Sequence, residues 1–231
     1  MIISLTGFIG SGKDTVADYL VDEYDFKRDA FASTVKDVLA VLFDWDREML
    51  EGRTKAAREQ RNQVDQWWSD RLQIEFFTPR WAMQHIGTDV FRAHFHDDVW
   101  IAALENRLRK HSGHIVITDA RYLNEIAMVR ALGGQSWHVE RGENPDWYNY
   151  ALRLNSADEQ TRLRMEMIAS IDKKPNVFNM KIHSSEWAWI GYPFDHNVDN
   201  NGSIKELYST LEDNIKNLEL TLLASKPGSN A

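Results

Sequence analysis

Apolar and polar residues follow two kinds of pattern along this chain, and the change from one to the other marks the predicted elements. Short apolar runs at residues 1–5, 114–118 and 137–140 predict buried strands, and a weaker run at 194–198 predicts a fourth. Between these runs, apolar residues recur three and four positions apart, which is the spacing of packed helices. The segments with helical spacing are residues 13–24, 35–43, 81–84, 99–108, 124–132 and 204–222.

The order of these elements indicates the fold class, because strands that alternate with helices are typical of an α/β protein. A polar helical stretch is expected around residues 157–171, followed by a turn at Asp172-Lys173-Lys174-Pro175. The sequence has no internal repeats and no linker long enough to divide it. We therefore expect one domain over residues 1–225 and a frayed tail over residues 226–231.

The composition narrows the classes of protein to which the chain can belong. Of its 231 residues, 43% are hydrophobic and 27% are charged, as in a globular protein. Cysteine is absent, which excludes disulfides and thiolate chemistry. The net charge of −8 argues against binding to duplex nucleic acid, which uses basic faces. No apolar run approaches the roughly 18 residues of a membrane span, and the N-terminus lacks a signal-peptide pattern, so we expect a cytoplasmic location.

The first predicted strand leads into a glycine-rich segment, Gly7-Phe8-Ile9-Gly10-Ser11-Gly12-Lys13, which fits G-x-x-x-x-G-K and opens a predicted helix. Glycines allow backbone N–H groups to surround an anion, and the helix N-terminus adds a partial positive charge. Lys13 reaches terminal phosphates as a point charge. The motif therefore predicts a nucleotide site without saying what is done with the nucleotide.

The position after this lysine departs from the usual pattern, in which Ser or Thr supplies a hydroxyl to Mg²⁺. Here Asp14 occupies that position and Thr15 follows it. A carboxylate beside a triphosphate is repulsive unless a cation lies between them. Two interpretations are open: Asp14 contacts Mg²⁺ through water, or Thr15 supplies the hydroxyl.

Two further clusters carry polar residues that suit a second phosphorylated ligand. Residues 78–89 combine a cation, an amide and a Gly-Thr turn, with Arg92 and Trp100 shortly after. In residues 115–125 an acid and a base, Asp119 and Arg121, leave the end of a predicted buried strand. Ligands of open α/β sheets bind at that end of the strands.

At these residues the sequence resembles the phage deoxynucleoside monophosphate kinases, the family of the T-even phage enzyme. The resemblance follows one order along most of the chain, and the ordered set is more specific than any member besides the P-loop. Its members are Ser11-Gly12-Lys13-Asp14-Thr15, Arg80, Gln84 to Asp89, Trp100, Asp119-x-Arg121, Glu125, His183-x-Ser185-Glu186 and Asn201-Gly202-Ser203.

The resemblance implies a P-loop NTPase-type parallel sheet flanked by helices. Two inserted helical parts are implied with it: an acceptor-binding segment over about residues 44–112 and a lid-like insertion over about residues 143–182. The implied reaction transfers a phosphoryl group from ATP, with Mg²⁺, to a deoxynucleoside 5′-monophosphate for DNA precursor synthesis. For a phage-encoded protein this places it in the host cytoplasm.

Carried over by position, the resemblance also assigns roles to individual residues. It places the ATP phosphates on Gly10, Ser11, Gly12, Lys13, Asp14 and Thr15, with Asp14 and Thr15 near Mg²⁺. It assigns the acceptor to Arg80, Gln84, Gly87, Thr88, Trp100, Asp119, Arg121, Glu125 and Ser185. The catalytic group is Lys13, Asp119 and Arg121. Phosphoryl transfer depends mostly on positioning and on positive charge, so cations are the residues it needs most.

Several of these residues have an ordinary structural alternative. Trp100 fits a hydrophobic core as well as a base-stacking surface. Arg53, Arg58 and Arg61 lie among acidic residues, where they form either a solvated ion-pair face or a grip on the acceptor phosphate. The basic residues of the insertion, Lys173 and Lys174 among them, suit either a closing lid or a solvated helix.

Two rival functions share the P-loop. One is another small-molecule kinase, of the dephospho-coenzyme A or phosphomevalonate type, and the other is a regulator that binds a nucleotide without a second substrate. A GTPase switch would usually carry an Asn-Lys-x-Asp run, and this sequence has none. The accepted base, the sugar preference and the oligomeric state, a homodimer included, are left open by the sequence.

Overall fold

The structure is a computed structural model that describes residues 1–169 and 175–224. The chain forms two compact units. We call the first, residues 1–28 with 113–231, the sheet unit, and the second, residues 29–112, the helical unit. The expected tail at 226–231 and most of the expected turn at 172–175 lie outside the described residues.

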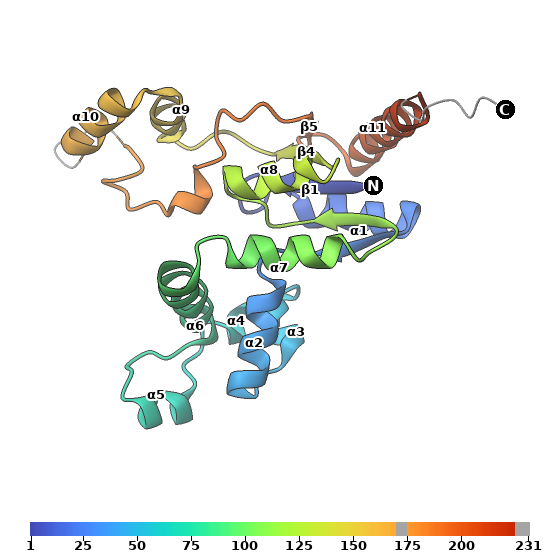
Figure 1. Cartoon of the computed structure of the whole chain (residues 1–231). Helices are drawn as coiled ribbons and strands as arrows, with labels where there is room; N and C mark the ends of the chain where they lie inside the picture. Colours follow the sequence, from blue (N-terminus) through green and yellow to red (C-terminus); the bar gives the residue numbers. More distant parts are fainter. Residues whose placement is uncertain (170–174, 225–231) are drawn as a thin grey trace. The chain divides into compact units, whose positions relative to one another are not determined.

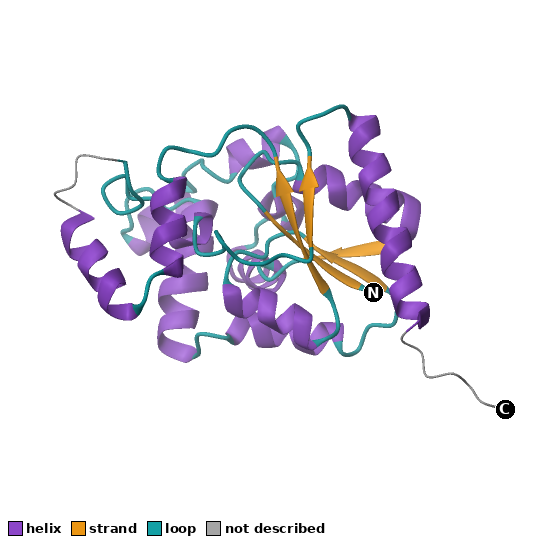
Figure 2. Ribbon diagram, turned by 90° about the horizontal axis from the view of Figure 1, so that it is seen from above, coloured by secondary structure: helices purple, strands orange, loops and turns teal. Residues whose placement is uncertain are grey.

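The sheet unit is built on five strands in the order β2-β3-β1-β4-β5 (Figure 2). Strand β1 is parallel to both β3 and β4, and β4 is parallel to β5. The registers place Ile3 opposite Val116 and Leu5 opposite Trp137. The strands are β1 (Ile2–Thr6), β2 (Phe26–Asp29), β3 (His114–Ile117), β4 (Gln135–Glu140) and β5 (His196–Asp199). The predicted α/β fold is thereby confirmed.

Alternation along the strands explains how helices cover the sheet, because successive side chains point to opposite faces. Ile3, Leu5 and Trp137 pack with residues of α1 and α11 in one core cluster. The neighbouring Ser4 and Ser136 are also buried, and α8 contacts the strands that carry them. The helices of this unit (Figure 1) are α1 (Lys13–Tyr24), α8 (Leu123–Ala131), α9 (Tyr148–Ser156), α10 (Glu159–Ala169), the 3₁₀ turn η2 (Ser184–Glu186) and α11 (Ile204–Ala224).

The helical unit consists of short helices around its own aromatic core, in which the rings of Trp45, Trp68 and Phe77 contact Phe43. Most of its helices are short because side-chain caps begin them in quick succession: Asp46, Thr54, Asp65 and Thr78 each accept a bond from a backbone N–H. The elements are α2 (Ser33–Phe43), α3 (Arg47–Glu51), α4 (Lys55–Gln60), α5 (Gln66–Leu72), α6 (Pro79–Gln84), the π-helix η1 (His85–Phe95) and α7 (Val99–Leu108).

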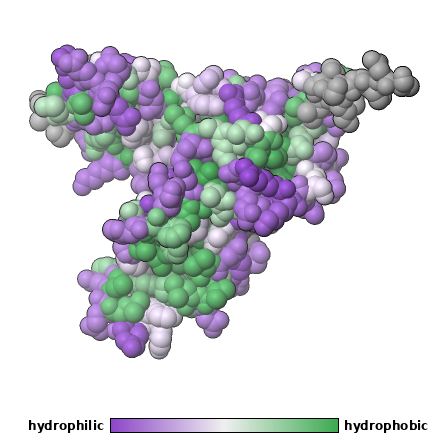
Figure 3. Space-filling view, viewed as in Figure 1, coloured by the Kyte–Doolittle hydropathy of each residue, from purple (hydrophilic) through white to green (hydrophobic). Residues whose placement is uncertain are grey.

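The surface of the helical unit carries exposed apolar side chains as well as charges. Hydrophobic residues (green) form patches on the face of this unit drawn in Figure 3. Its exposed large apolar residues include Val41, Leu42, Trp67 and Phe76. Within the described residues, no helix is long and apolar enough to cross a membrane.

Besides the short helices α3, α4 and α5 and the turn η2, three elements of the described structure had no counterpart in the sequence prediction. Strand β2 is mostly polar, with the sequence Phe-Lys-Arg-Asp at the edge of the sheet, so it lacks an apolar run. Helix α9 lies in a segment whose pattern was unclear. The third is the π-helix η1, a rare form that sequence spacing does not reveal and that is frequent at functional sites.

Candidate active site

The P-loop lies between β1 and α1, in the context that the motif predicts. Gly7, Gly10 and Gly12 have φ values of 148°, 83° and 100°, which favour glycine. Space also requires two of them: a Cβ on Gly7 would lie 2.4 Å from the carbonyl oxygen of Val139, and one on Gly12 would lie 2.1 Å from Nδ2 of Asn200. The loop is therefore held tightly by β4 and by the segment after β5.

Lys13 is the first residue of α1, and its ammonium donates hydrogen bonds to the carbonyl oxygens of Gly7 and Phe8, both at 2.8 Å. The pKa of Lys13 is lowered from its usual 10.5 to about 8, chiefly because the ammonium is buried and secondly because of the positive charge of Arg121. Asp14 and Glu186 oppose this effect. The main cost to the charged lysine is therefore burial, which a bound anion would offset.

Arg121 follows β3 and approaches this lysine closely enough to affect its pKa, as expected for two members of one anion site. Its guanidinium donates to Oε1 of Glu186 at 2.6 Å. Its backbone N–H donates to Oε2 of Glu125 at 2.7 Å, and that of Tyr122 donates to the same oxygen at 3.1 Å. Glu125 is buried and caps the start of α8, so its carboxylate fixes the Arg121 loop.

Two other predicted residues of the sheet unit lie near this loop in the fold. Asp119 is half-buried two residues after the end of β3, and the hydroxyl of Thr6 donates to the carbonyl oxygen of the next residue, Ala120, at 3.1 Å. Ser185 lies in η2, next to Glu186, with its Oγ 2.9 Å from Nδ1 of His183. The strand-end loop and η2 are thus linked through the Arg121–Glu186 ion pair.

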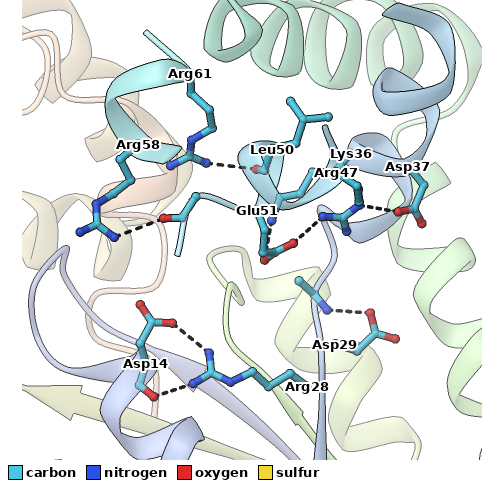
Figure 4. Close-up of polar contacts among 12 residues, drawn as sticks. Asp14, Arg28, Asp29, Lys36, Asp37, Arg47, Leu50, Glu51, Arg58 and Arg61 are labelled. Carbon is cyan, nitrogen blue, oxygen red and sulfur yellow. Dashed lines mark hydrogen bonds and ion pairs between the residues drawn. The ribbon is translucent and has the colours of Figure 1, made fainter. Parts of the chain in front are cut away.

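Asp14 is engaged by a cation at the start of α1 (Figure 4). Arg28 donates to Oδ1 of Asp14 at 3.1 Å and to its carbonyl oxygen at 2.7 Å. The same guanidinium donates to Oδ1 of Asp18 at 2.6 Å. Arg28 therefore offsets the charge of the carboxylate that looked out of place beside a triphosphate. Thr15, the next residue, is half-buried.

Aromatic residues attach the P-loop to the expected lid-like insertion. The ring centroid of Phe8 lies 5.7 Å from that of Trp147 and 4.9 Å from that of Trp189, both in edge-on geometry. Trp147 directly precedes α9, and the Tyr150 hydroxyl of α9 donates to the Met165 carbonyl oxygen of α10 at 2.9 Å. A continuous set of contacts thus joins the phosphate loop to α9 and α10.

The remaining predicted acceptor residues lie in the helical unit. Arg80 and Gln84 are four residues apart on α6, so they share a face of that helix, and both are exposed. Gly87 and Thr88 follow in η1. Trp100 of α7 donates its indole N–H to the carbonyl oxygen of Gly87 at 2.8 Å and packs on the core of this unit. Trp100 therefore contributes to the packing of this unit, next to the predicted acceptor residue Gly87.

Arg58 and Arg61, which the sequence left undecided, lie with Arg80 in one electrostatic cluster. Burial lowers the pKa of Arg61, and the positive charges of Arg80 and Arg58 lower it further. Glu51 opposes this effect, but its carboxylate already accepts bonds from Lys36 at 3.0 Å and from Arg47 at 2.7 Å (Figure 4). The helical unit thus holds a second concentration of positive charge.

Comparison with known proteins identifies the relationship. Residues 52–149 match the sequence model of a family described as deoxynucleotide monophosphate kinase. A candidate deoxynucleotide monophosphate kinase of Acanthamoeba polyphaga mimivirus is 29% identical over 155 residues, which are 61% of this chain and 74% of that protein. The deoxynucleoside-5′-monophosphate kinase of Escherichia phage T5 is 24% identical, over 56% of this chain and 72% of that protein. The chain is a relative of the deoxynucleotide monophosphate kinases.

The segment that matches the kinase family includes most of the predicted acceptor residues, whereas the P-loop and Ser185 lie outside it. The matched predicted residues are Arg80, Gln84, Gly87, Thr88, Trp100, Asp119, Arg121 and Glu125. Among solved structures, the shikimate kinase of Aquifex aeolicus superposes with a TM-score of 0.46 at 12% identity, over 95% of this chain and 99% of that chain.

One residue that contacts the P-loop of this relative of the deoxynucleotide monophosphate kinases was not predicted from the sequence. Asn200, directly after β5, donates from Nδ2 to the carbonyl oxygen of Ser11 at 2.8 Å, and its own N–H donates to the Glu140 carbonyl oxygen at 2.8 Å. Asn200 is buried, and it is 189 positions from Ser11 in the sequence. The motif Asn201-Gly202-Ser203 drew attention to this region but gave no sign of the contact.

Proposed function

We propose that this protein transfers the terminal phosphoryl group of ATP to a deoxynucleoside 5′-monophosphate, which gives the diphosphate for DNA synthesis. The observation that carries the proposal is the P-loop between β1 and α1, with Lys13 at the start of the helix and Arg121, held by Glu186, close enough to lower the pKa of that lysine. Two cations at the end of a phosphate-binding loop suit a reaction in which negative charge spreads over a transferred group. The relationship to named deoxynucleotide monophosphate kinases supports this acceptor.

Each element of the P-loop site has a role in this reaction. The N–H groups of residues 10–15 bind the ATP phosphates, and Lys13 binds the terminal ones as a point charge. Arg121, held by Glu186, stabilises the charge that develops on the transferred group. The acceptor phosphate has a second pKa near ~6 and is largely a dianion at neutral pH, so the reaction needs no strong general base. Asp119 is then assigned to Mg²⁺ or its water rather than to proton abstraction.

The oxygen donors present fit a magnesium ion, which prefers few protein ligands and keeps several waters. Thr15 and Asp119 are the residues that would hold it, since the carboxylate of Asp14 is engaged by Arg28. When bound, Mg²⁺ neutralises phosphate charge and orients the terminal phosphoryl group. This proposal chooses the Thr15 hydroxyl between the two interpretations that the sequence left open.

An acceptor screen tests the proposed function. The full chain is mixed with ATP and Mg²⁺ and with each deoxynucleoside monophosphate, each ribonucleoside monophosphate or dephospho-coenzyme A, and ADP formation is followed. We expect acceptor-dependent ADP and a deoxynucleoside diphosphate with one or more deoxynucleoside monophosphates. Turnover with dephospho-coenzyme A alone would assign the chain to the rival kinase class, and nucleotide binding with no acceptor-dependent turnover would identify a regulator.

A further inference from the structure

We propose that Arg61, with Arg58 and Arg80 beside it, forms an anion site in the helical unit that binds the phosphomonoester group of the acceptor. Only the identity of the ligand rests on the proposed function, because the site itself follows from geometry and charge. We call these three residues the arginine cluster. All three lie in the helical unit, on or next to α4 and α6.

Arg61 is the centre of the arginine cluster because its hydrogen-bonding capacity is left unused. Within the described residues, its Nε is buried without a hydrogen-bond partner. Its Nη1 donates to the carbonyl oxygen of Leu50 at 3.4 Å, a long contact. A guanidinium has five N–H donors, and buried donors are almost always paired in native proteins. A ligand that accepts hydrogen bonds would satisfy this one.

Other arginines of the helical unit show how this fold usually satisfies a guanidinium. Arg107 donates to both carboxylate oxygens of Asp29, at 3.0 and 2.9 Å, and also to the hydroxyl of Thr34. Arg47 bridges the carboxylates of Asp37 and Glu51 at 2.6 and 2.7 Å. Arg61 differs. The carboxylate that acts on its pKa, that of Glu51, already forms ion pairs with Arg47 and Lys36.

The backbone around Arg61 is shaped to admit its guanidinium. Gly52 ends α3 with a φ of 69°, and a Cβ built there would lie 2.3 Å from Cζ of Arg61. Arg58 donates to the carbonyl oxygens of Gly52 and Arg53, at 3.2 and 2.7 Å. The N–H of Arg80 donates to the carbonyl oxygen of Arg61 at 2.9 Å, which ties α6 to the residue after α4. The arginine cluster is therefore held in place by contacts among α3, α4 and α6.

The chemistry of the arginine cluster indicates a compact dianion. The planar fork of a guanidinium matches phosphate oxygens in pairs, which an ammonium does not. A phosphomonoester carries nearly two negative charges at neutral pH, enough to offset the mutual repulsion of adjacent arginines. The side chain of Arg80 is exposed, which leaves its guanidinium accessible to the same ligand.

The test measures binding of 2-deoxyribose 5-phosphate, the part shared by all deoxynucleoside monophosphates, with 2-deoxyribose as the uncharged comparison. Calorimetry uses the full chain carrying Lys13→Met, so that the P-loop does not mask the second site. We expect Arg61→Gln in this background to weaken binding of the phosphate about 10- to 100-fold, as for the loss of a charge-assisted hydrogen bond. The control Arg109→Gln removes an exposed arginine of the same unit and should leave binding within about 2-fold.

A second pair of variants moves the guanidinium without removing a charge. Gly52→Ala places a methyl group against Arg61 and should weaken phosphate binding as Arg61→Gln does. Gly133→Ala is matched to it, since Gly133 has a φ of 75° but open space around its Cβ position. Its binding should be unchanged. Circular dichroism is used to check that each variant is folded. If Arg61→Gln does not fold, Gly52→Ala still tests whether the position of the Arg61 guanidinium determines phosphate binding.

Binding to a folded Arg61→Gln chain within about 2-fold of its parent would overturn the proposal. Steady-state kinetics separates this failure from that of the proposed function. Arg61→Gln with an intact Lys13 should raise the KM for the monophosphate and leave the KM for ATP unchanged. Arg61-dependent phosphate binding without any monophosphate turnover would refute the kinase assignment alone. Turnover with an unchanged acceptor KM in Arg61→Gln would refute the arginine cluster alone.

Discussion

The sheet unit and the helical unit each hold a partly buried cation whose pKa is lowered by burial and by other cations. Lys13 satisfies its ammonium on two carbonyl oxygens of the loop that precedes it. Arg61 has a buried Nε without a partner in the described chain and depends on residues from α3, α4 and α6 for its surroundings. The loop that holds Lys13 is one contiguous segment, whereas the surroundings of Arg61 come from segments that only the fold brings together.

This difference explains what each site is suited to do. A loop of backbone N–H groups with one lysine adapts to the several phosphates of a nucleotide donor. A rigid guanidinium fork with unused donors selects a single phosphate group by geometry. Substitutions at Lys13, Glu51, Asn200 and Asp14 test this contrast, and their expected effects decrease in that order.

The largest effect is expected from Lys13→Met. It removes the charge that binds the terminal phosphates, and we expect kcat to fall about 10²- to 10³-fold. Lys205→Met, on the exposed side of α11, is the matched control and should retain full activity. Coupled measurement of ADP formation gives both values. A Lys13→Met protein with kcat within tenfold of the natural one would remove the P-loop lysine from the mechanism.

The next effect concerns Glu51, whose carboxylate accepts hydrogen bonds from Lys36 and Arg47. Its pKa is lowered from 4.5 to about 2: burial acts in the opposite direction, but the bonds and charges of Arg47 and Lys36 outweigh it. Because the folded pKa is the lower one, this stabilisation is present above pH 4.5 and is lost as the pH falls toward 2. We expect it to contribute on the order of 3 kcal/mol to the free energy of unfolding.

Urea unfolding at pH 7 and at pH 3 measures this contribution as a difference between variants. The natural chain should lose more than half of its advantage over Glu51→Gln between these pH values, because the folded pKa of about 2 lies below pH 3. Glu59→Gln, whose carboxylate is exposed and 3.8 Å from Lys55, should follow the natural chain throughout. An equal pH dependence of the natural chain and Glu51→Gln would show that Glu51 does not carry the expected ion pairs.

A smaller effect is expected at Asn200, which supports the P-loop as Gly52 supports Arg61. Asn200→Ala leaves the buried carbonyl oxygen of Ser11 without its donor. We expect a loss of about 1–3 kcal/mol in the free energy of unfolding, together with a raised KM for ATP. The control Asn217→Ala changes an exposed residue of α11 and should alter neither quantity. If Asn200→Ala and Asn217→Ala had the same free energy of unfolding and the same KM for ATP, the Asn200–Ser11 hydrogen bond would not stabilise the P-loop.

The smallest effect is expected from Asp14→Asn. Arg28 engages this carboxylate, whose side chain is 86% exposed, so its charge should contribute little to metal binding. We expect the Mg²⁺ concentration for half-maximal rate to change less than about 2-fold, within the weak range of exposed ion pairs. Thr15→Val should raise that concentration clearly. The opposite ranking of the two variants would identify Asp14 as the residue through which Mg²⁺ is held.

The sequence predicted those parts of the molecule that depend on neighbouring residues. The P-loop is contiguous, so its residues and its place between β1 and α1 were predictable. Four strands were predictable because they are apolar runs, whereas β2 at the edge of the sheet is mostly polar and was not predicted. Arg121 was expected near Lys13 because both follow strands of one sheet. The Asn200–Ser11 contact was not, since it joins residues at opposite ends of the chain.

Arg61 is a second such case, because its lack of an acidic hydrogen-bond partner depends on how α3 and α4 pack. In the sequence it lies among Glu51, Glu59 and Asp65, and simple proximity favours a solvated ion-pair face. In the structure Glu51 is taken by Arg47 and Lys36, and Asp65 accepts a hydrogen bond from the indole of Trp45. The surplus of positive charge therefore results from pairing choices that composition does not reveal.

The decisive measurement is a calorimetric count of anion sites on the full chain. A non-hydrolysable ATP analogue with Mg²⁺ and 2-deoxyribose 5-phosphate are titrated into the natural protein, Lys13→Met and Arg61→Gln. We predict that each ligand binds with a stoichiometry of one. Lys13→Met should weaken only the ATP analogue, and Arg61→Gln only the sugar phosphate. Loss of both ligands in either single variant, or competition of both for one site, would contradict the assignment of one anion site to each unit.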